Sequence, residues 1–490
     1  MMCSDISARH FPPRQHRYGG RVKTSPVLPL IVATALFIEN MDSTVIATSL
    51  PAMAVDLDTS PIALKLAMTT YLIALAVFIP VSGWVADRVG ARRTFIAAIA
   101  VFLLGSLACA SASTLTGLIA ARALQGVGGA MMVPVGRLVI LRSVPKSELV
   151  AAMSWLTIPA LVAPVIGPPL GGFITTTWDW RWIFLINLPM GVVGIVLALR
   201  FIPNLRGPDT KLDGRGFALS GIGLALALFG FSTLGRHVVS SSLALGVLVA
   251  GLALLAGYVV HARRSAAPLL DLRLLQIDTF RIGVLSGMLF RVAIGATPFL
   301  LPLMLQAGFG LDPLHSGLLT FASAVGAIFM KTVATHVLRR FGFRQVLLKN
   351  AVLASACMAA IGLFTQTTPH VVIVAFLVVM GCFRTLQLTS INAILYADVP
   401  PLQLGQATSL AGMMQQLSLS IGVAVGGYAL ELAGMVRGTD ATDVHNFPVA
   451  FVVVGVIAAQ SAWFARSLPP DAGAEVSGRA PSSSKPSPSK

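Results

Sequence analysis

The chain has 490 residues, of which 56% are hydrophobic and 11% are charged, and its mean hydropathy is +0.83. Soluble proteins carry about 25% charged residues, so this composition excludes an ordinary soluble domain. The ten-residue alternation of a membrane β-barrel is not visible, and spanning helices satisfy their own backbone hydrogen bonds, so we expect an all-α membrane protein. The formal net charge of +16 raises the question of nucleic-acid binding.

The two ends of the chain differ in composition from the rest. Residues 1–26 are polar and basic, and we expect them to form a cytoplasmic tail. The apolar segment that follows is too long for the core of a signal peptide, so no cleavable signal peptide is predicted. Residues 467–490 are rich in Ser, Pro and Lys and are predicted to form a disordered cytoplasmic tail.

Fourteen apolar segments between these tails are long enough to cross a hydrocarbon core of about 30 Å. The predicted spans are residues 27–50, 62–85, 94–113, 115–142, 149–177, 182–202, 214–234, 243–262, 280–306, 314–338, 345–366, 370–395, 405–432 and 446–466. With the amino terminus in the cytoplasm, most Lys and Arg residues fall on the cytoplasmic side, as the positive-inside rule requires. Both termini are then cytoplasmic, and the positive charge reflects membrane topology rather than nucleic-acid binding.

The first span carries two carboxylates, Glu39 and Asp42, within apolar sequence. Glu39 lies about 18 Å along the helix from Val27, near the middle of the membrane. The two residues are three apart and share a helix face. An intramembrane carboxylate is costly and points to function, so we expect this pair to carry protons. The alternative is that Asp42 only hydrogen-bonds neighbouring helices.

A charged run from Ser82 to Arg93 separates the second and third spans, and we interpret it as their water-exposed link. Its pattern, G-x-x-x-D-R-x-G-x-R-R, resembles the signature loop of the major facilitator superfamily of secondary transporters. That resemblance implies a cytoplasmic loop that latches the two halves of the transporter in one conformation. The residues that match are Gly83, Asp87, Arg88, Gly90, Arg92 and Arg93.

The fourth span contains Arg122 and Gln125, followed by closely spaced glycines that allow helices to approach. This segment resembles the arginine motif of the same superfamily, which is associated with proton transfer. The resemblance adds Arg122 to Glu39 and Asp42 as a proton-coupling group. A purely structural arginine is the alternative.

The fifth span is rich in proline and glycine, which kink a helix and admit a neighbour at the kink. It resembles the antiporter motif that separates exporters from uptake carriers in this superfamily. The matching residues are Pro164, Gly167, Pro168, Gly171 and Gly172. Alanines at 160 and 163 replace the usual glycines, which is a change between small residues. The aromatic segment from Trp178 to Trp182 then resembles the family's entry to the sixth helix, and we interpret it as an interfacial anchor.

The chain contains an internal repeat, because residues 338–345 echo residues 86–93 at an offset of about 252–254. The second copy carries Arg339 in place of Asp87. Two such repeats predict six-helix bundles at 27–202 and 280–466 with a site between them. The remaining residues, 203–279, supply an inserted helix pair with cytoplasmic linkers. Fourteen helices with a central pair resemble the drug:proton antiporter branch of the superfamily, the EmrB/QacA group.

Two arginines, Arg291 and Arg384, lie in the middle of predicted spans of the second repeat. They are predicted either to pair with Glu39 and Asp42 or to bind an anionic substrate, since arginine binds carboxylates and phosphates bidentately. Structural pairing is the third possibility. Lys331 lies nearer the cytoplasmic edge, where it could snorkel. The candidate substrate cavity therefore comprises Glu39, Asp42, Gln125, Arg291 and Arg384.

These features predict a proton-coupled antiporter that exports drugs or other small amphipathic compounds across the inner membrane of a bacterial cell by alternating access. The alternative is a proton-coupled exporter of an organic anion held by the intramembrane arginines. The sequence suggests no enzyme, since it lacks a nucleophile–base pair, and no cofactor or metal, since Cys3, Cys109, Cys357 and Cys382 are scattered. The proton gradient would supply the energy. Substrate charge, proton stoichiometry, oligomeric state and any accessory efflux proteins stay open.

Overall fold

A computed structural model describes residues 27–143, 162–163, 166–206, 211–233, 240–265, 268–400, 403–469 and 472–473. The predicted tail at 1–26 and nearly all of 467–490 lie outside these ranges. Thirteen helices of the described part are long and apolar enough to cross a membrane, and each overlaps one of the predicted spans. The remaining prediction, 149–177, is described only at residues 162–163 and in a helical segment at 166–177. The prediction of an all-α membrane protein is confirmed.

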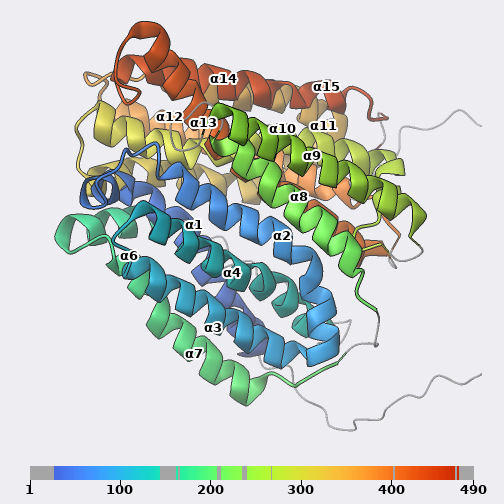
Figure 1. Cartoon of the computed structure of the whole chain (residues 1–490). Helices are drawn as coiled ribbons and strands as arrows, with labels where there is room; N and C mark the ends of the chain where they lie inside the picture. Colours follow the sequence, from blue (N-terminus) through green and yellow to red (C-terminus); the bar gives the residue numbers. More distant parts are fainter. Residues whose placement is uncertain are drawn as a thin grey trace, which may run out of the picture.

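The first set of helices forms the N-terminal half, the lower part of the molecule in Figure 1. Its members are α1 (Val27–Asp56), α2 (Lys65–Val89), α3 (Ala91–Ala110), α4 (Leu115–Ser143), the segment 166–177, α6 (Trp182–Leu185) and α7 (Asn187–Phe201). Helix α4 packs between α2 and α3, and α7 packs on α1 and α3. This half therefore surrounds a core of its own that includes Tyr71, Phe95 and Phe102.

The second set forms the C-terminal half, the upper part of Figure 1. It comprises α10 (Asp278–Leu303), the short π-helix η3 (Met304–Gly308), α11 (Pro313–Ala360), η4 (Ile361–Leu363), α12 (His370–Leu395), α13 (Leu404–Arg437), η6 (Val444–Asn446), α14 (Phe447–Ala459) and α15 (Ser461–Ala465). Helix α11 packs on α12 and α14, and α10 packs on α13. Prolines 298 and 302 lie inside α10, where each removes one backbone hydrogen bond.

Between the two sets of helices along the chain lies a pair of helices. Helix α8 (Gly214–Thr233) and α9 (Ser241–Arg264) pack on each other, and η2 (Leu272–Gln276) leads from them to α10. Helix α8 contacts both α2 and α13, so the hairpin lies across one edge of the boundary between the halves (Figure 1). The Tyr428 hydroxyl on α13 donates a hydrogen bond to the carbonyl of Phe231 on α8.

The internal repeat is visible in the backbone. Positive φ angles occur at Gly90 and Gly342, 106° and 75°, and at Asp58 and Gly310, 45° and 73°. The members of each pair are 252 residues apart, in agreement with the offset predicted from the sequence. Left-handed backbone favours glycine, which explains its use at three of these four positions.

The link between α2 and α3 is shorter than predicted. Helix α2 continues through Val89 and α3 begins at Ala91, so Gly90 alone joins them and the rest of the charged run is helical. The amide of Ala91 donates to the carbonyl of Leu205, which fixes this corner against the segment after α7. Helix ends that project beyond the lipid keep their backbone hydrogen bonds while their charged side chains reach water, and this explains the difference.

The two halves touch along a seam that is closed at one end. We call this end the far face; it holds the turn between α1 and α2 and the start of α11. The opposite end, where α1 begins and α15 ends, is the termini face. Near the far face, Gln306 Nε2 donates to the Thr48 carbonyl at 3.0 Å, and Lys65 Nζ lies 3.9 Å from Glu431 Oε2.

Backbone-to-backbone packing closes the same end of the seam. A methyl group on Gly172 would overlap the carbonyl of Pro313 on α11, and one on Gly317 would overlap the carbonyl of Pro168. Two helices approach this closely only where both present glycine. The segment 166–177 therefore docks directly on the start of α11.

Candidate transport site

A buried ion pair lies inside the N-terminal half. Arg122 Nη1 of α4 contacts Asp42 Oδ2 of α1 at 2.6 Å, and the two side chains are each 1% exposed. Gln125 and Asn187 donate from their amide nitrogens to Asp42 Oδ1 at 2.8 and 3.0 Å. Since every contact comes from a neighbouring helix of the same half, the charge of Asp42 is neutralised without any group from the C-terminal half.

The pair belongs to a wider polar network that joins four helices. Ser106 of α3 accepts hydrogen bonds from Gln125 at 2.8 Å and from Asn187 at 3.3 Å. Arg122 also donates to Gln125 Oε1 at 2.5 Å, and its guanidinium lies 4.2 Å from the ring centroid of Tyr71. A buried pair is tolerated when its remaining donors and acceptors are satisfied, as they largely are here.

Asn187 and Ser106 are members of this network that the sequence did not reveal. Asn187 lies five residues after Trp182, where the aromatic segment that we interpret as an anchor ends, and it is completely buried at the start of α7. Within the aromatic segment itself, Trp180 is buried and donates to Asp56 at 3.2 Å, while Trp178 and Trp182 are exposed. The sequence feature that could have identified Asn187 is a polar residue within an apolar span, close to the aromatic anchor.

Glu39 lies one turn before Asp42 on α1 but in a different environment. Its Oε2 atom is buried and accepts no hydrogen bond among the described residues. Its charged neighbours are Asp42 and Arg137, an exposed residue of α4 that the sequence analysis did not single out. The two carboxylates of α1 are thus distinct, since Asp42 is paired and Glu39 retains an unsatisfied oxygen.

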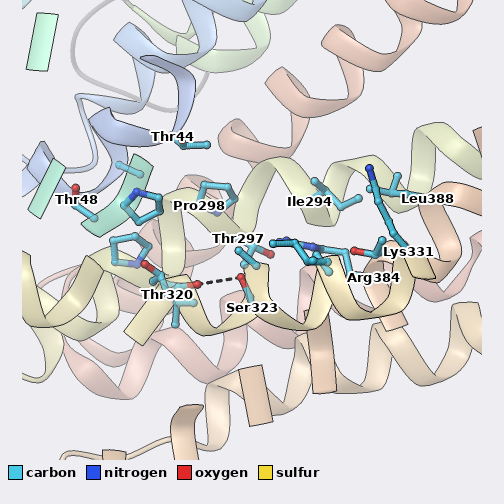
Figure 2. Close-up of a pocket in the computed structure, with 18 of the residues that line it drawn as sticks. Thr44, Thr48, Ile294, Thr297, Pro298, Thr320, Ser323, Lys331, Arg384 and Leu388 are labelled. Carbon is cyan, nitrogen blue, oxygen red and sulfur yellow. Dashed lines mark hydrogen bonds between the residues drawn. The ribbon is translucent and has the colours of Figure 1, made fainter. Parts of the chain in front are cut away.

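A cavity of about 410 Å³ lies between the halves. It is lined by α1, the segment 166–177, α10, α11 and α12 (Figure 2). At one end Thr48 and Thr320 are buried, and at the other end, eleven residues further along α11, Lys331 is exposed. The cavity is therefore closed toward the far face, in agreement with the contacts across the seam.

Most of the cavity wall is apolar. The aliphatic and proline residues that line it are Ala47, Pro168, Ile294, Pro298, Leu301, Pro302, Ala324, Ala327, Ile328 and Leu388. Hydroxyl groups interrupt this surface, and they belong to Thr44, Thr48, Thr297, Thr320, Ser323, Thr385 and Thr389. Ligand pockets of about 300–1,000 Å³ with such walls hold drug-sized compounds.

The predicted cavity residues are divided between the cavity and its surroundings. As far as the described residues define the lining, it includes Arg384 but not Glu39, Asp42, Gln125 or Arg291. Asp42 and Gln125 belong to the buried network instead. Arg291 is 6% exposed and donates to Asn392 Oδ1 at 2.6 Å, so an amide that faces the cavity separates it from the space inside. The hypothesis that Arg291 pairs with Glu39 or Asp42 finds no such contact in the described part.

The signature-loop residues lie at the termini face. Asp87 Oδ1 contacts Arg142 Nη2 at the end of α4 at 2.6 Å, and both side chains are partly exposed. This ion pair joins α2 to α4 within the N-terminal half rather than joining the two halves. Arg88 lies over the ring of Trp84 at 5.6 Å, and Arg92 and Arg93 are at the start of α3. A methyl group on Gly83 would meet open space.

The antiporter-motif residues face two partners. Gly167 and Gly171 pack against α1 at Thr44 and Val45, whereas Gly172 packs against α11. Pro168 lines the cavity, and Pro164 lies outside the described residues. One short helical segment thus connects α1, the cavity and the opposite half.

Comparisons with known proteins agree with this architecture. The Major Facilitator Superfamily sequence profile matches residues 32–270 and 283–489. The "Putative multidrug resistance protein MdtD" of Serratia proteamaculans is 36% identical over 446 residues, which cover 90% of this chain and 93% of that protein. Its counterpart from Yersinia enterocolitica is also 36% identical, over 90% of this chain and 95% of that protein.

Solved structures share the fold at low sequence identity. A D-xylose–proton symporter superposes with a TM-score of 0.67 at 14% identity and covers 91% of this chain and 98% of its own. The human organic anion transporter MFSD10 gives a TM-score of 0.59 at 13% identity, with 90% and 99% of the two chains covered. The relatives that match are transporters rather than enzymes. With a profile match along nearly its whole length, two related halves and a cavity between them, the chain belongs to the major facilitator superfamily.

Proposed function

We propose that this chain exports small amphipathic compounds in exchange for protons by alternating access. The observation that carries the proposal is the apolar cavity between the two halves, closed toward one face by contacts that cross the seam. The relatives named for multidrug resistance support export of such compounds.

Glu39 is the proposed proton carrier. A buried carboxylate with an unsatisfied oxygen is costly when ionised, and protonation removes that cost. The Asp42–Arg122 pair holds the neighbouring charge in a fixed arrangement, so protonation of Glu39 changes the local charge within an otherwise neutral network. Arg137 of α4 is a positively charged neighbour of Glu39.

The membrane arrangement is part of the proposal. We assign the termini face to the cytoplasm and the chain to the inner membrane of a bacterial cell, because the basic residues concentrate at that face. Residues 27–202 and 280–466 are the two bundles that rock, and 203–279 are the inserted pair with its linkers. Co-purification from membranes tests whether accessory efflux proteins extend the transport path.

A second candidate function is the export of organic anions. Lys331 and Arg384 both line the cavity, and no carboxylate is present in its described lining. This favours an acidic substrate over a cationic one. The sequence analysis considered Arg291 together with Arg384 for this role; we assign it instead to Lys331 and Arg384, because both line the cavity.

The test is transport by the purified full-length chain in proteoliposomes with an imposed pH gradient. We expect uptake of compounds from a mixed panel together with counterflow of protons. Glu39→Gln should abolish accumulation driven by the gradient and retain energy-independent exchange. Asp278→Asn, which removes a carboxylate from an exposed pair on α10, is the control. Full gradient-driven accumulation by Glu39→Gln would contradict the assignment of the proton site.

A further inference from the structure

Two basic side chains face the cavity without a partner of opposite charge. Lys331 of α11 and Arg384 of α12 both line it, and among the described residues neither has a hydrogen-bond or ion-pair partner. Both lie at the same end of the cavity, the right side of Figure 2, and Ile294 and Leu388 lie beside them. The other arginine at this depth, Arg291, already bonds Asn392.

The two intramembrane carboxylates of α1 do not neutralise these cations. Asp42 is held by Arg122, Gln125 and Asn187 inside the N-terminal half, and Glu39 is not part of the described lining. The cavity therefore has a net positive charge from its own walls. Arg384 is only partly exposed, and a partly buried cation without a partner is costly. A ligand that brings an acidic group recovers that cost through charge-assisted hydrogen bonds.

The rest of the lining indicates what the remainder of such a ligand, apart from its acidic group, must be like. Toward the far face the wall includes Leu301 and Pro302, together with the hydroxyls of Thr48, Thr320 and Ser323. Along α11, Thr320 and Lys331 are separated by about 16 Å at 1.5 Å per residue. A ligand that fills this length has an apolar body near the far face and its charge near the termini face.

We propose that Lys331 and Arg384 form an anion-binding site, and that the preferred substrates of this carrier are amphipathic acids with one carboxylate, sulfonate or phosphate group. The planar guanidinium of Arg384 offers a fork for two oxygens, and the flexible ammonium of Lys331 adds a second positive contact. A cationic amphiphile meets repulsion at the same place. The inference rests on the proposed function only in taking this cavity as the substrate site.

Binding measurements test the proposal without a proton gradient. Fluorescein and rhodamine 123 share a ring scaffold but carry opposite charge at mildly alkaline pH, and fluorescence anisotropy reports the binding of each to the purified full-length chain. We expect fluorescein to bind more tightly than rhodamine 123. Lys331→Gln and Arg384→Gln should each weaken fluorescein binding roughly tenfold or more, as the loss of a charged hydrogen bond predicts.

Matched variants make the result specific. Lys331→Arg should retain fluorescein binding, since the charge stays. Lys349→Gln removes an exposed lysine of the next span, beyond the non-helical Gly342 in α11, that is not part of the described lining, and it should bind like the unchanged chain. Equal fluorescein affinity in the unchanged chain, Lys331→Gln and Arg384→Gln overturns the proposal, and so does tighter binding of rhodamine 123.

An anionic lipid headgroup offers the same chemistry as a soluble acid. The measurement is therefore repeated in phosphatidylcholine nanodiscs with and without phosphatidylglycerol. Competition by phosphatidylglycerol that disappears in Arg384→Gln would assign the site to lipid as well as to soluble acids, whereas no competition assigns it to soluble acids. Because none of these steps needs a gradient, loss of proton-driven transport with intact anion binding would contradict the proposed function and leave this inference standing.

Discussion

Lys65 and Glu431 approach to 3.9 Å across the seam, one from the start of α2 and the other from the end of α13. Lys65 is completely buried, and its ammonium also lies 4.0 Å from the ring centroid of Tyr428. This contact spans the two halves at the far face, so its energy counts only while that face is closed. The contact thereby shifts the conformational equilibrium toward the state in which the far face is closed.

Glu431→Gln should therefore favour opening of the far face. Breaking a buried pair by removing one partner costs about 3–5 kcal/mol, and half-buried pairs cost less, so we expect the labelling rate of a cysteine placed at Thr48 to rise roughly fivefold or more. The measurement uses a membrane-impermeant thiol reagent on a background without native cysteines. Asp278→Asn, which breaks a pair within α10, should leave the rate unchanged.

Gly172→Ala should prevent full closure of the same face. Its new methyl group would overlap the carbonyl of Pro313, which belongs to the backbone and cannot move aside alone. We expect transport to fall by roughly tenfold or more, since overpacking of this kind costs about 1–3 kcal/mol or more in the closed state. Initial transport rates in proteoliposomes check this, with Gly246→Ala as control because a methyl group there meets open space. Equal rates for both variants would show that the close contact is dispensable.

The Asp42–Arg122 pair should show strong coupling in a double-mutant cycle. Asp42→Asn leaves the buried Arg122 charge unpaired, so we expect a loss of about 3–5 kcal/mol in stability, and Arg122→Gln should cost a similar amount. The double variant should be more stable than the sum of the single losses predicts. Thermal unfolding of the detergent-solubilised chain measures all three. Additive losses would indicate that the two side chains do not interact.

Asp213 should make the hairpin linker sensitive to acid. Burial alone would raise the pKa of Asp213, but hydrogen bonds from the Gly216 amide, His261 and the Leu269 amide outweigh it and lower that pKa. A carboxyl whose pKa is depressed in the folded state contributes stability above its unfolded value near 3.9 and loses it as the pH falls through the folded value. Asp213→Asn should thus lower the melting temperature at neutral pH.

The same difference should disappear in acid. Melting temperatures of the unchanged chain and Asp213→Asn, compared from neutral pH downward, should converge below the ordinary range of an aspartate pKa. Asp271→Asn is a control, because Asp271 caps η2 in the same linker through the Arg273 amide but forms no hydrogen bond or ion pair with α8 or α9 among the described residues. A constant difference at every pH would mean that the asparagine acts through packing rather than through charge.

The sequence predicted the number and order of spans and the repeat because these depend on length, hydropathy and local backbone. Gly90 and Gly342 illustrate this, since their spacing in the sequence reappears as two left-handed turns. The sequence also located Asp42 and Arg122 at membrane depth. It could not pair them, because they lie 80 residues apart and each had several possible partners.

The sequence could not predict how each helix is rotated about its own axis. A helix that is apolar on all sides gives no stripe from which to read its buried face, so Arg291 and Arg384 were indistinguishable. Packing decides between them: Arg291 faces Asn392, whereas Arg384 lines the cavity. For the same reason the sequence did not reveal Asn187, which reaches Asp42 only because of the way α7 is rotated toward α1.

The placement of the α8–α9 hairpin limits where a substrate can approach the carrier from within the bilayer. Since α8 covers the edge where α2 and α13 meet, acyl chains are kept from that side of the joint. A lipophilic molecule dissolved in the leaflet therefore meets the hairpin, instead of the α2–α13 joint, when it approaches along that edge.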